Sequence, residues 1–487
     1  VIDGQIIQWV TDILHQVKNK YFDIPQAPNR RTHTAFLLFG ISPSSANWSL
    51  LYHTFSSIAI EKQLQSKKKC GIIKLIFLKD KEELTMAYIA LLGFGTVGSG
   101  VAEVLSKKQT QLANYIGSEA RIRYILDLRD FPDSPFGHLV IHDFDRILND
   151  PEISVVAEMM GGSHPAYDFT KACLCAGKSV VTSNKEVVAK FGGELLRIAA
   201  EHGVSYRFEA SVGGGIPIIH PMLTDLSPNS VIAIDGILNG TTNYMLTAMA
   251  KDGADYADIL AKAQSLGYAE ANPSADVEGI DAARKIIILS ALAFGKMLPL
   301  EAVHTEGITA LTQDDFSRAQ QFGFTIKLIA HAERRPDGRI LAAVTPQLVR
   351  ASSPLYGIND VFNGILVDTD MLGKVMFYGK GAGKFPTASA VVADIAATLS
   401  ARESNVRASW DDASQDDIAD YAEFTCARMV TLRGNKDAAD AAFGIDNTAF
   451  SATNNSYTYL TAPISETVFR ERLASCGAEL ISALRIL

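Results

Sequence analysis

The sequence has few cysteines and lacks the spacing of cysteine and histidine that would hold a structural zinc ion. Five cysteines are spread over 487 residues, and no CxxC pair occurs. This thin, odd set excludes a disulfide framework and indicates reduced thiols, so we expect a cytoplasmic protein. Cys173 and Cys175 form the nearest pair, and we expect both to be buried in a helical segment.

The sequence also lacks a long apolar run and an excess of positive charge. No stretch reaches the ~18–20 uninterrupted apolar residues that a membrane span requires, so we expect no membrane association through a spanning segment. The net charge of -9 leaves no overall positive field for a phosphate backbone, which argues against nucleic acid as a partner. A content of 47% hydrophobic and 20% charged residues is instead typical of folded globular domains.

Residues 1–85 differ from the rest of the chain. They carry more basic than acidic residues and show few helical or alternating patterns. A clear pattern begins at Met86, and the codons of residues 81–83 can contain a bacterial ribosome-binding sequence. We therefore predict that Met86 is the initiator and that residues 1–85 are leader sequence. The alternative is a loosely ordered extension.

From Met86 onward, short apolar strands alternate with amphipathic helices. This order predicts an α/β domain with a doubly wound, Rossmann-type parallel sheet over residues 86–208. Longer elements then indicate an α+β domain over residues 209–378. A polar stretch over residues 400–417 is typical of a linker, and we expect residues 418–487 to form a small separate unit.

A glycine-rich hexapeptide follows the first of these strands. Gly93, Gly95 and Gly98 form GxGxxG between the apolar strand YIALL and a helix, the context in which this motif binds a dinucleotide. The first glycine permits a tight turn, the second lets the pyrophosphate approach the backbone, and the third packs helix against strand. We therefore expect a cofactor to bind at Gly93, Phe94, Gly95, Thr96, Val97 and Gly98.

The second strand ends in a segment that bears on the choice of cofactor. Its sequence is Ile125-Leu126-Asp127-Leu128-Arg129-Asp130. It offers both an acidic residue for the ribose 2′-hydroxyl of NAD and an arginine for the 2′-phosphate of NADP. Spacing alone does not choose between them, and we favour Arg129 and hence NADP(H).

A second concentration of charged residues lies over residues 267–285. Asp281 and Lys285 are four residues apart and share one face of the helix expected to begin near Gly279. The simplest interpretation is an ordinary exposed ion pair. A loop with three more carboxylates precedes this pair, however, and the helix then becomes almost wholly apolar. The pair should therefore lie at the rim of a buried site, where a lysine can take part in proton transfer.

Three other segments follow predicted strands. Lys185 lies at the expected carboxyl edge of the parallel sheet, where ligands bind in this fold, although a surface lysine would fit the same pattern. Residues 209–217 and 239–243 contain small side chains and many backbone donors and acceptors. Ordinary turn chemistry would explain both.

Taken together, these residues resemble the homoserine dehydrogenase family, in its bacterial form with an appended regulatory domain. Seven motifs occur in the family's order between residue 86 and about residue 399. They are GFGTVGSGV, AEMMGG, VVTSNKEVVA, FEASVGGGIPII, GILNGTTNYML, LGYAEANPSADVEGIDAARK and YGKGAGKFPTASAVVADI. The resemblance implies NAD(P)-dependent interconversion of L-homoserine and L-aspartate 4-semialdehyde, a step toward threonine and methionine.

The resemblance also implies roles for individual residues. Lys285 corresponds to the catalytic lysine that binds substrate and protonates the nascent alkoxide, and Asp281 would orient it. Lys185 corresponds to the family's other lysine near nicotinamide and substrate, and it is the alternative proton donor. Glu270 and Asp276 correspond to the carboxylates that hold the amino group of homoserine.

Further ligand contacts are implied by the same comparison. Those to the cofactor extend to Arg129, Ser183, Lys185 and Gly381. A structural sodium ion is implied at Glu209 and at the backbone oxygens of Val212, Gly214 and Ile216, since a hard cation favours oxygen ligands.

The resemblance finally concerns domain order and assembly. Residues 379–402 would return the chain to the nucleotide domain, and the protein would be a homodimer or homotetramer built through the substrate domain. Residues 418–487 resemble a ferredoxin-like ACT domain only in their second half, and they lack the DxPGVLA turn at which an effector amino acid binds. We therefore expect a degenerate ACT-like domain.

Two other functions fit parts of this pattern. An aspartate-semialdehyde dehydrogenase needs a thiolate nucleophile, and no cysteine here lies in a suitable strand-end loop. A regulatory protein that senses NAD(P) without turnover needs no acid, whereas Lys185, Asp281 and Lys285 occur together.

Overall fold

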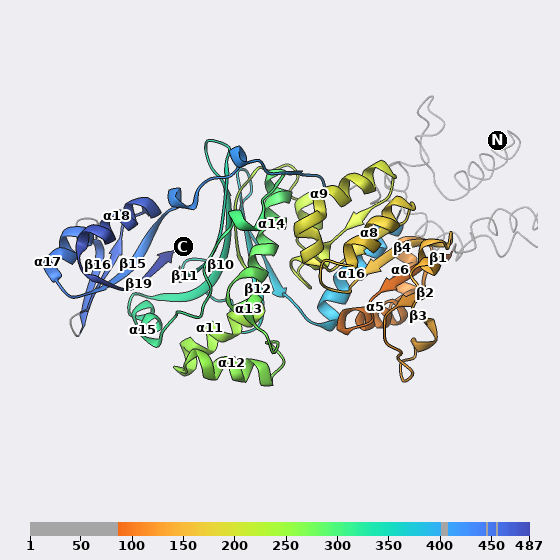
Figure 1. Cartoon of the computed structure of the whole chain (residues 1–487), viewed down its shortest axis with the longest axis horizontal. Helices are drawn as coiled ribbons and strands as arrows, with labels where there is room; N and C mark the ends of the chain where they lie inside the picture. The colour runs from red at the N-terminus through yellow and green to blue at the C-terminus, as the bar shows by residue number, and fades with distance from the viewer. Residues whose placement is uncertain (1–85, 401–407, 445–446, 454–455) are drawn as a thin grey trace, which may run out of the picture. The chain divides into compact units, whose positions relative to one another are not determined.

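The computed structural model describes residues 86–400, 408–444, 447–453 and 456–487 (Figure 1). The predictions for residues 1–85, including the start at Met86, lie outside these described residues. Among the helices of the described part, none is long and apolar enough to cross a membrane.

The first domain is built on a six-stranded parallel sheet with the order β3-β2-β1-β4-β5-β6. Its strands are β1 (Met86–Leu92), β2 (Glu119–Leu126), β3 (Val140–Ile141), β4 (Ile153–Glu158), β5 (Ser179–Thr182) and β6 (Tyr206–Arg207). The strand order reverses at β1, which opens a crevice outside the carboxyl ends of β1 and β4. The predicted Rossmann-type α/β fold is confirmed.

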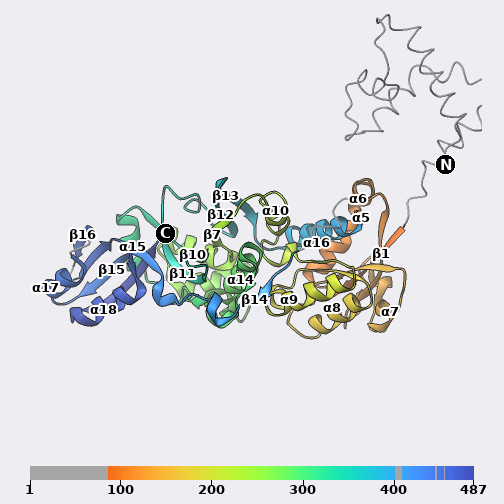
Figure 2. The same cartoon turned by 90° about the horizontal axis from the view of Figure 1, so that it is seen from above.

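Helices cover both faces of this sheet. Figure 2 shows α5, α6 and α16 on one side, and α8 and α9 on the other. The helices are α5 (Thr96–Lys107), α6 (Gln109–Ile116), α7 (Asp145–Leu148), α8 (Ala166–Cys175), α9 (Lys185–Glu201) and α16 (Lys384–Leu399). Although α16 follows the second domain in the chain, it packs on α5, β4 and β5 and buries Val391 and Ile395 there. A late segment of the chain thus completes the core of the first domain.

The second sheet is mixed and has eleven strands in the described residues. Its order is β13-β12-β7-β10-β11-β19-β15-β17-β16, with β18 beside β15 and β9 beside β11. The strands before residue 400 are β7 (Val231–Ile237), β9 (His304–Thr305), β10 (Phe324–Arg334), β11 (Ile340–Arg350), β12 (Phe362–Thr369) and β13 (Gly373–Lys380). Those after it are β15 (Thr425–Arg433), β16 (Asn447–Thr453), β17 (Ser456–Thr461), β18 (Ile464–Ser465) and β19 (Glu479–Ile486).

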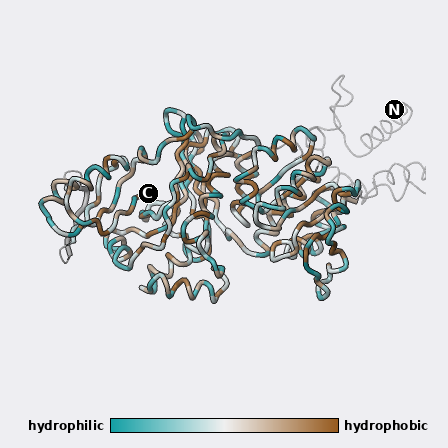
Figure 3. Tube along the Cα trace, viewed as in Figure 1, coloured by the Kyte–Doolittle hydropathy of each residue, from teal (hydrophilic) through white to brown (hydrophobic). Residues whose placement is uncertain are grey.

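One helix dominates the packing of this second domain. α14 (Ile280–Phe294) is apolar on nearly all sides because it lies between β7, β10 and β11 on one side and α9 of the first domain on the other. Figure 3 shows hydrophobic residues concentrated along these inner strands and helices. The other helices of this domain are α10 (Ile219–Leu223), α11 (Gly240–Asp252), α12 (Tyr256–Ser265), α13 (Ser274–Val277) and α15 (Gln313–Gln321).

The C-terminal segment extends the sheet of the second domain. After β15 come α17 (Lys436–Ala439), β16, β17, α18 (Glu466–Cys476) and β19. β19 pairs antiparallel with β15 and in parallel with β11, where Gln347 lies opposite Arg485. We expected residues 418–487 to form a separate unit, but their strands are continuous with the sheet of the second domain. No local sequence pattern predicts a pairing between strands so far apart in the chain.

The end of the predicted linker is also docked. Trp410 is buried, and its ring lies where a Cβ at Gly192 of α9 would stand. β14 (Asp411–Asp412) pairs with β8 (Lys296–Met297) in a small separate ladder. A single tryptophan in a polar stretch gives too weak a periodic signal to reveal this contact.

The expectation for the paired cysteines is half wrong. Cys173 is buried, but Cys175 is exposed. Both lie on α8, where side chains two positions apart point in different directions, so one helix face cannot bury both.

Candidate active site

The GxGxxG loop joins β1 to α5 at the point where the strand order reverses. Gly93 has a φ of +92°, and a Cβ there would lie 2.9 Å from the carbonyl oxygen of Met159. A Cβ at Gly98 would lie 2.1 Å from the Gly93 oxygen, whereas a Cβ at Gly95 would meet no atom within 4 Å. Gly93 therefore has the geometry of a tight turn, Gly98 makes a close packing contact, and Gly95 leaves an open approach. This arrangement fits a dinucleotide pyrophosphate.

The other residues of this loop are also suitably placed. Thr96 and Val97 begin α5, whose first turn has neither a side-chain cap nor an acidic residue. The N-terminal amides of such a helix suit a phosphate. Phe94 is buried, and its ring packs edge-on against that of Phe131, which holds the loop on the sheet.

Asp127 and Arg129 form one ion pair at the end of β2. The Phe94 amide donates to Asp127 Oδ2 at 2.8 Å, and Arg129 Nε donates to Oδ1 at 3.0 Å. Burial would raise the pKa of Asp127, but hydrogen bonds from Arg129 and Phe94 hold it below its usual value. The Arg129 side chain is 65% exposed, so its guanidinium remains accessible while the Asp127 carboxylate is already in use.

A buried carboxylate joins two lysines from different domains. Lys285 Nζ donates to Asp281 Oδ2 at 2.7 Å and to the Leu238 carbonyl oxygen at 2.7 Å. Lys185 Nζ lies 3.1 Å from the other oxygen, Asp281 Oδ1. Asp281 is 6% exposed and Lys285 is 8% exposed, so this is not an ordinary surface ion pair. The apolar surroundings of α14 bury this pair, whereas its sequence predicts a position at the rim of a buried site.

The charge of Asp281 is set by its neighbours. Burial alone would raise the pKa of this carboxyl group, but the positive charges of Lys285 and Lys185 lower it well below its ordinary value. Hydrogen bonds from Lys285 and Asn239 act in the same direction. Asp281 is therefore an anion that both ammonium groups share.

Asn239 links this centre to a third carboxylate. Its Nδ2 donates to Asp276 Oδ1 at 2.7 Å and to Asp281 Oδ2 at 2.8 Å, while its Oδ1 accepts from the Thr242 amide at the start of α11. Burial raises the pKa of Asp276, and the negative charge of Asp281 adds to this effect. The sequence alone left this segment open, with ordinary turn chemistry as one explanation. The N-cap position of Asn239 was a usable signal, but the partners of its amide depend on how α11 packs against α13.

A second polar cluster positions Lys185, and sequence reasoning missed it. The Asn184 side chain caps α9, of which Lys185 is the first residue, and its Nδ2 donates to the Gly162 carbonyl oxygen at 2.7 Å. Beneath it, Glu158 is fully buried at the end of β4 and accepts a 2.6 Å hydrogen bond from Thr182 Oγ1. Burial raises the pKa of Glu158. The signal available in the sequence was Glu158, a charged residue at the end of an apolar strand.

Three of the predicted site residues lie outside the hydrogen-bonded cluster around Asp281. Glu270 is exposed in the loop before α13, and no hydrogen bond or ion pair of its carboxylate occurs within the described residues. The Ser183 amide donates to the Glu158 carbonyl oxygen at 3.2 Å, beside Lys185. Gly381 follows β13, where a Cβ would lie 2.0 Å from Asn363 Nδ2.

The Glu209 side chain is used as a helix cap. Its carboxylate accepts from the amides of Ile218 at 2.6 Å, Ile219 at 2.9 Å and His220 at 2.7 Å, at the start of α10. Val212, Gly214 and Ile216 are buried in the loop between. Across the described ranges, no group of three or more His, Cys, Asp or Glu side chains could hold a metal ion. A cation here would depend on backbone carbonyl oxygens.

Comparison with known proteins identifies the family. Residues 93–209 match a family model described as the NAD-binding domain of homoserine dehydrogenase, and residues 217–396 match one described as homoserine dehydrogenase. A homoserine dehydrogenase from Synechocystis is 45% identical over 313 residues, which are 63% of this chain and 72% of that protein. The chain belongs to the homoserine dehydrogenase family.

Solved structures of homoserine dehydrogenases agree. The crystal structure of the enzyme from Thiobacillus denitrificans has a TM-score of 0.76 at 33% identity and covers 83% of this chain and 98% of that chain. A hyperthermophilic archaeal homoserine dehydrogenase in complex with NADPH has a TM-score of 0.55 at 27% identity, covering 64% of this chain and 98% of that one. As a homoserine dehydrogenase, the chain is an NAD(P)-dependent oxidoreductase that interconverts L-homoserine and L-aspartate 4-semialdehyde.

The glycine loop of this homoserine dehydrogenase generates a paired prediction. Gly98→Ala places a methyl group against the Gly93 carbonyl oxygen and should lower the free energy of unfolding by about 1–3 kcal/mol. Gly95→Ala places its methyl group in open space, so thermal unfolding should be unchanged. The same methyl group would stand where the pyrophosphate approaches the backbone, so NADP should bind more weakly. Thermal unfolding and a fluorescence titration with NADP measure both effects. Unchanged NADP affinity in Gly95→Ala would show that the pyrophosphate does not approach this loop.

Proposed function

We propose that Lys285 is the residue that exchanges a proton with the substrate oxygen. In the direction of aldehyde reduction, bound NAD(P)H supplies a hydride to the carbonyl carbon, and the oxygen then needs a proton. Two of the three N–H bonds of the Lys285 ammonium donate to Asp281 and to the Leu238 carbonyl group. This fixes the ammonium group and leaves one N–H for the substrate oxygen, which is the observation that carries the proposal.

Asp281 and Lys185 support this proton transfer. After Lys285 gives a proton to the alkoxide, solvent returns one to it, and the Asp281 anion holds the lysine in place. In homoserine oxidation the same groups act in reverse: Lys285 first gives a proton to solvent, and its neutral amine then accepts the hydroxyl proton. Lys185 shares the other Asp281 oxygen from the nucleotide domain, where it would face both nicotinamide and substrate. A second positive charge there stabilises the developing alkoxide.

The substrate ammonium group is proposed to bind Asp276 and Glu270. Asn239 donates to one oxygen of Asp276, and the Thr241 side chain also hydrogen-bonds to this carboxylate. A carboxylate has about four acceptor sites, so it can also accept from the substrate ammonium group. A cation beside Asp276 would offset the burial and the repulsion from Asp281 that raise its pKa. Glu270, exposed in the adjacent loop, would complete the pair when homoserine binds.

NADP is the proposed preferred cofactor, with NAD as the alternative. The accessible Arg129 guanidinium suits a 2′-phosphate, whereas the Asp127 carboxylate is already bound to the glycine loop and to Arg129. The archaeal relative in complex with NADPH supports this choice. Ser183, Lys185 and Gly381 are proposed to contact the nicotinamide half of the cofactor.

A structural sodium ion is a further proposal, at the loop after Glu209. Because the Glu209 carboxylate caps α10, the ligands would be backbone oxygens of Val212, Gly214 and Ile216. Oxygen-only coordination suits a hard cation.

Residues 418–487 are proposed to be an ACT-like domain. Their order, β15-α17-β16-β17-α18-β19 with β15 between β17 and β19, is the order of a ferredoxin-like unit.

We also propose a homodimer or homotetramer built through the substrate domain. The strand β13 forms one edge of the sheet in the substrate domain and follows a turn at which Met371 and Leu372 are exposed. An exposed apolar turn of this kind is suited to a subunit contact.

Replacing Lys285 tests the proposed proton donor. Lys285→Met should lower kcat for homoserine oxidation about 100-fold or more while NADP still binds, because the proton acceptor is lost. Arg284→Met, next to it on α14, is the matched control and should keep wild-type kcat. Spectrophotometric assays of NADPH formation provide the measurement. Near-normal kcat in Lys285→Met, with a large loss in Lys185→Met, would assign the proton transfer to Lys185.

Replacing Arg129 tests the cofactor preference. Arg129→Ala should raise the KM for NADP about tenfold or more, since a charge-assisted hydrogen bond is lost, and should leave the KM for NAD unchanged. Arg121→Ala removes another exposed arginine from β2 and should change neither value. Equal changes in the two KM values of Arg129→Ala would contradict a 2′-phosphate contact.

A further inference from the structure

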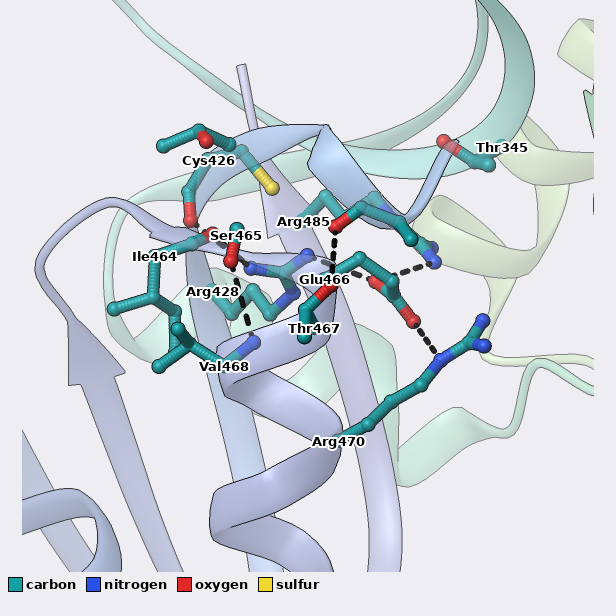
Figure 4. A network of polar contacts seen from close by, with 12 residues as sticks. Thr345, Cys426, Arg428, Ile464, Ser465, Glu466, Thr467, Val468, Arg470 and Arg485 are labelled. Carbon is teal, nitrogen blue, oxygen red and sulfur yellow. Dashed lines mark hydrogen bonds and ion pairs between the residues drawn. The ribbon is translucent and has the colours of Figure 1, made fainter. Parts of the chain in front are cut away.

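The C-terminal segment contacts the substrate domain through a chain of ion pairs, and Figure 4 shows the members of this chain that lie within the segment. Arg428 on β15 and Glu466 at the start of α18 form its inner pair, with Nη2 2.9 Å from Oε2, and they are 1% and 5% exposed. Arg485 on β19 lies 3.7 Å from the same Glu466 oxygen. Arg470 donates to the other Glu466 oxygen at 2.9 Å. The position of Arg485 is therefore fixed from within the C-terminal segment.

Arg485 then binds a carboxylate of the substrate domain. Its Nη1 and Nη2 donate to the two oxygens of Glu306 at 2.7 and 2.6 Å, a bidentate pair. His304 Nε2 lies 2.7 Å from Glu306 Oε1, and the His304 ring stacks on Tyr421 at 3.6 Å. Burial would raise the pKa of Glu306, but the hydrogen bonds from His304 and Arg485 lower it to about 2. Glu306 is thus a fixed anion across the neutral range.

The backbone next to Glu306 lies directly against the end of α13. The Ile308 amide donates to the Val277 carbonyl oxygen at 2.9 Å. A Cβ at Gly307 would lie 2.3 Å from that same oxygen and 2.8 Å from Glu278 Cα. Two backbones in such close contact cannot move independently, so a shift of residues 306–308 displaces the end of α13.

This end of α13 carries the proposed substrate site. Asp276 lies one residue before Val277, and the turn at Gly279 leads into the first turn of α14, where Asp281 lies. A Cβ at Gly279 would stand 3.0 Å from Thr305 Cγ2, so the turn also rests on the β9 segment that leads to Glu306. The contacts are therefore continuous from the last strand of the chain to the two carboxylates of the site.

We propose that Glu306 and Arg485 are positioning residues for homoserine: the last strand holds residues 306–308 in the place that directs Asp276 toward the substrate ammonium group. The inference rests on the proposed function, because Asp276 is the proposed ammonium-binding carboxylate. Its effect is selective for homoserine. The glycine loop that binds the cofactor lies on the other sheet, at the end of β1.

A second ion pair across the same boundary provides a control. Arg339, in the turn between β10 and β11, donates to both oxygens of Glu423 at 2.8 Å. It also joins the C-terminal segment to the substrate domain through a bidentate contact. Arg339 lies at the start of β11, however, whereas residues 306–308 lie against α13. Its loss removes an equivalent contact without loosening the substrate loop.

The test measures steady-state kinetics of the full chain carrying Glu306→Gln, Arg485→Met or both. Each single variant should raise the KM for homoserine about three- to tenfold, while kcat and the KM for NADP stay within about twofold of wild type. The double variant should be no worse than the more affected single variant, because both substitutions break one contact. Arg339→Met should leave the KM for homoserine unchanged.

Several results would overturn the proposal. These are an unchanged KM for homoserine in Glu306→Gln, an equal rise in Arg339→Met, or a parallel rise in the KM for NADP, which would indicate a general loss of structure. If Arg485→Met does not fold, Arg485→Lys keeps the charge, loses the bidentate contact and should still raise the KM for homoserine. Asp276→Asn separates the two claims: an unchanged KM there refutes the proposed function. A raised KM there with none in Glu306→Gln refutes only this inference.

Discussion

The proposed active site of this enzyme depends on one buried carboxylate shared by two lysines. Asp281 binds Lys285 through one oxygen and Lys185 through the other, and the two lysines come from different domains. A buried charge is costly unless it is paired and hydrogen-bonded, and removing one partner of such a pair destabilises a protein by about 3–5 kcal/mol. The Asp281 carboxylate and the buried Lys285 ammonium group therefore require one another, and Lys185 is a second, partly exposed partner. The site exists only where the nucleotide and substrate domains meet.

The rest of the fold serves to hold this carboxylate in place. α14 is apolar over most of its surface, so it lies between the mixed sheet and α9 and brings Asp281 and Lys285 inside. Asn239 ties Asp281 to Asp276, and the Asn184 cap directs the first residue of α9, Lys185, toward them. Each contact positions a charged group of the proposed site.

Much of this could be predicted from local patterns. The three glycines after an apolar strand indicated the nucleotide loop, and the four-residue spacing of Asp281 and Lys285 before an apolar helix indicated a pair at the rim of a buried site. These signals are local because they depend on strand and helix periodicity. The amide of Asn239 and the pairing of β19 with β11 were not predictable in this way. Their partners are set by the packing of segments far apart in the chain.

The link from Arg485 to Glu306 illustrates the same limit. In the sequence, either residue alone looks like an ordinary charged side chain on a partly exposed element. Only the parallel pairing of β19 with β11 brings the two residues together. Once they meet, the chain's last strand becomes part of the support for the substrate loop. Interactions of this kind connect regions that a linear motif search treats as independent.

The central claim is that the negative charge of Asp281 organises both lysines. The most direct measurement is kcat for homoserine oxidation by Asp281→Asn, with NADP affinity determined on the same sample. The amide keeps the shape of the side chain but loses the charge, so kcat should fall about 100-fold or more while the NADP dissociation constant changes little. An Asp281→Asn enzyme with wild-type kcat would contradict the account.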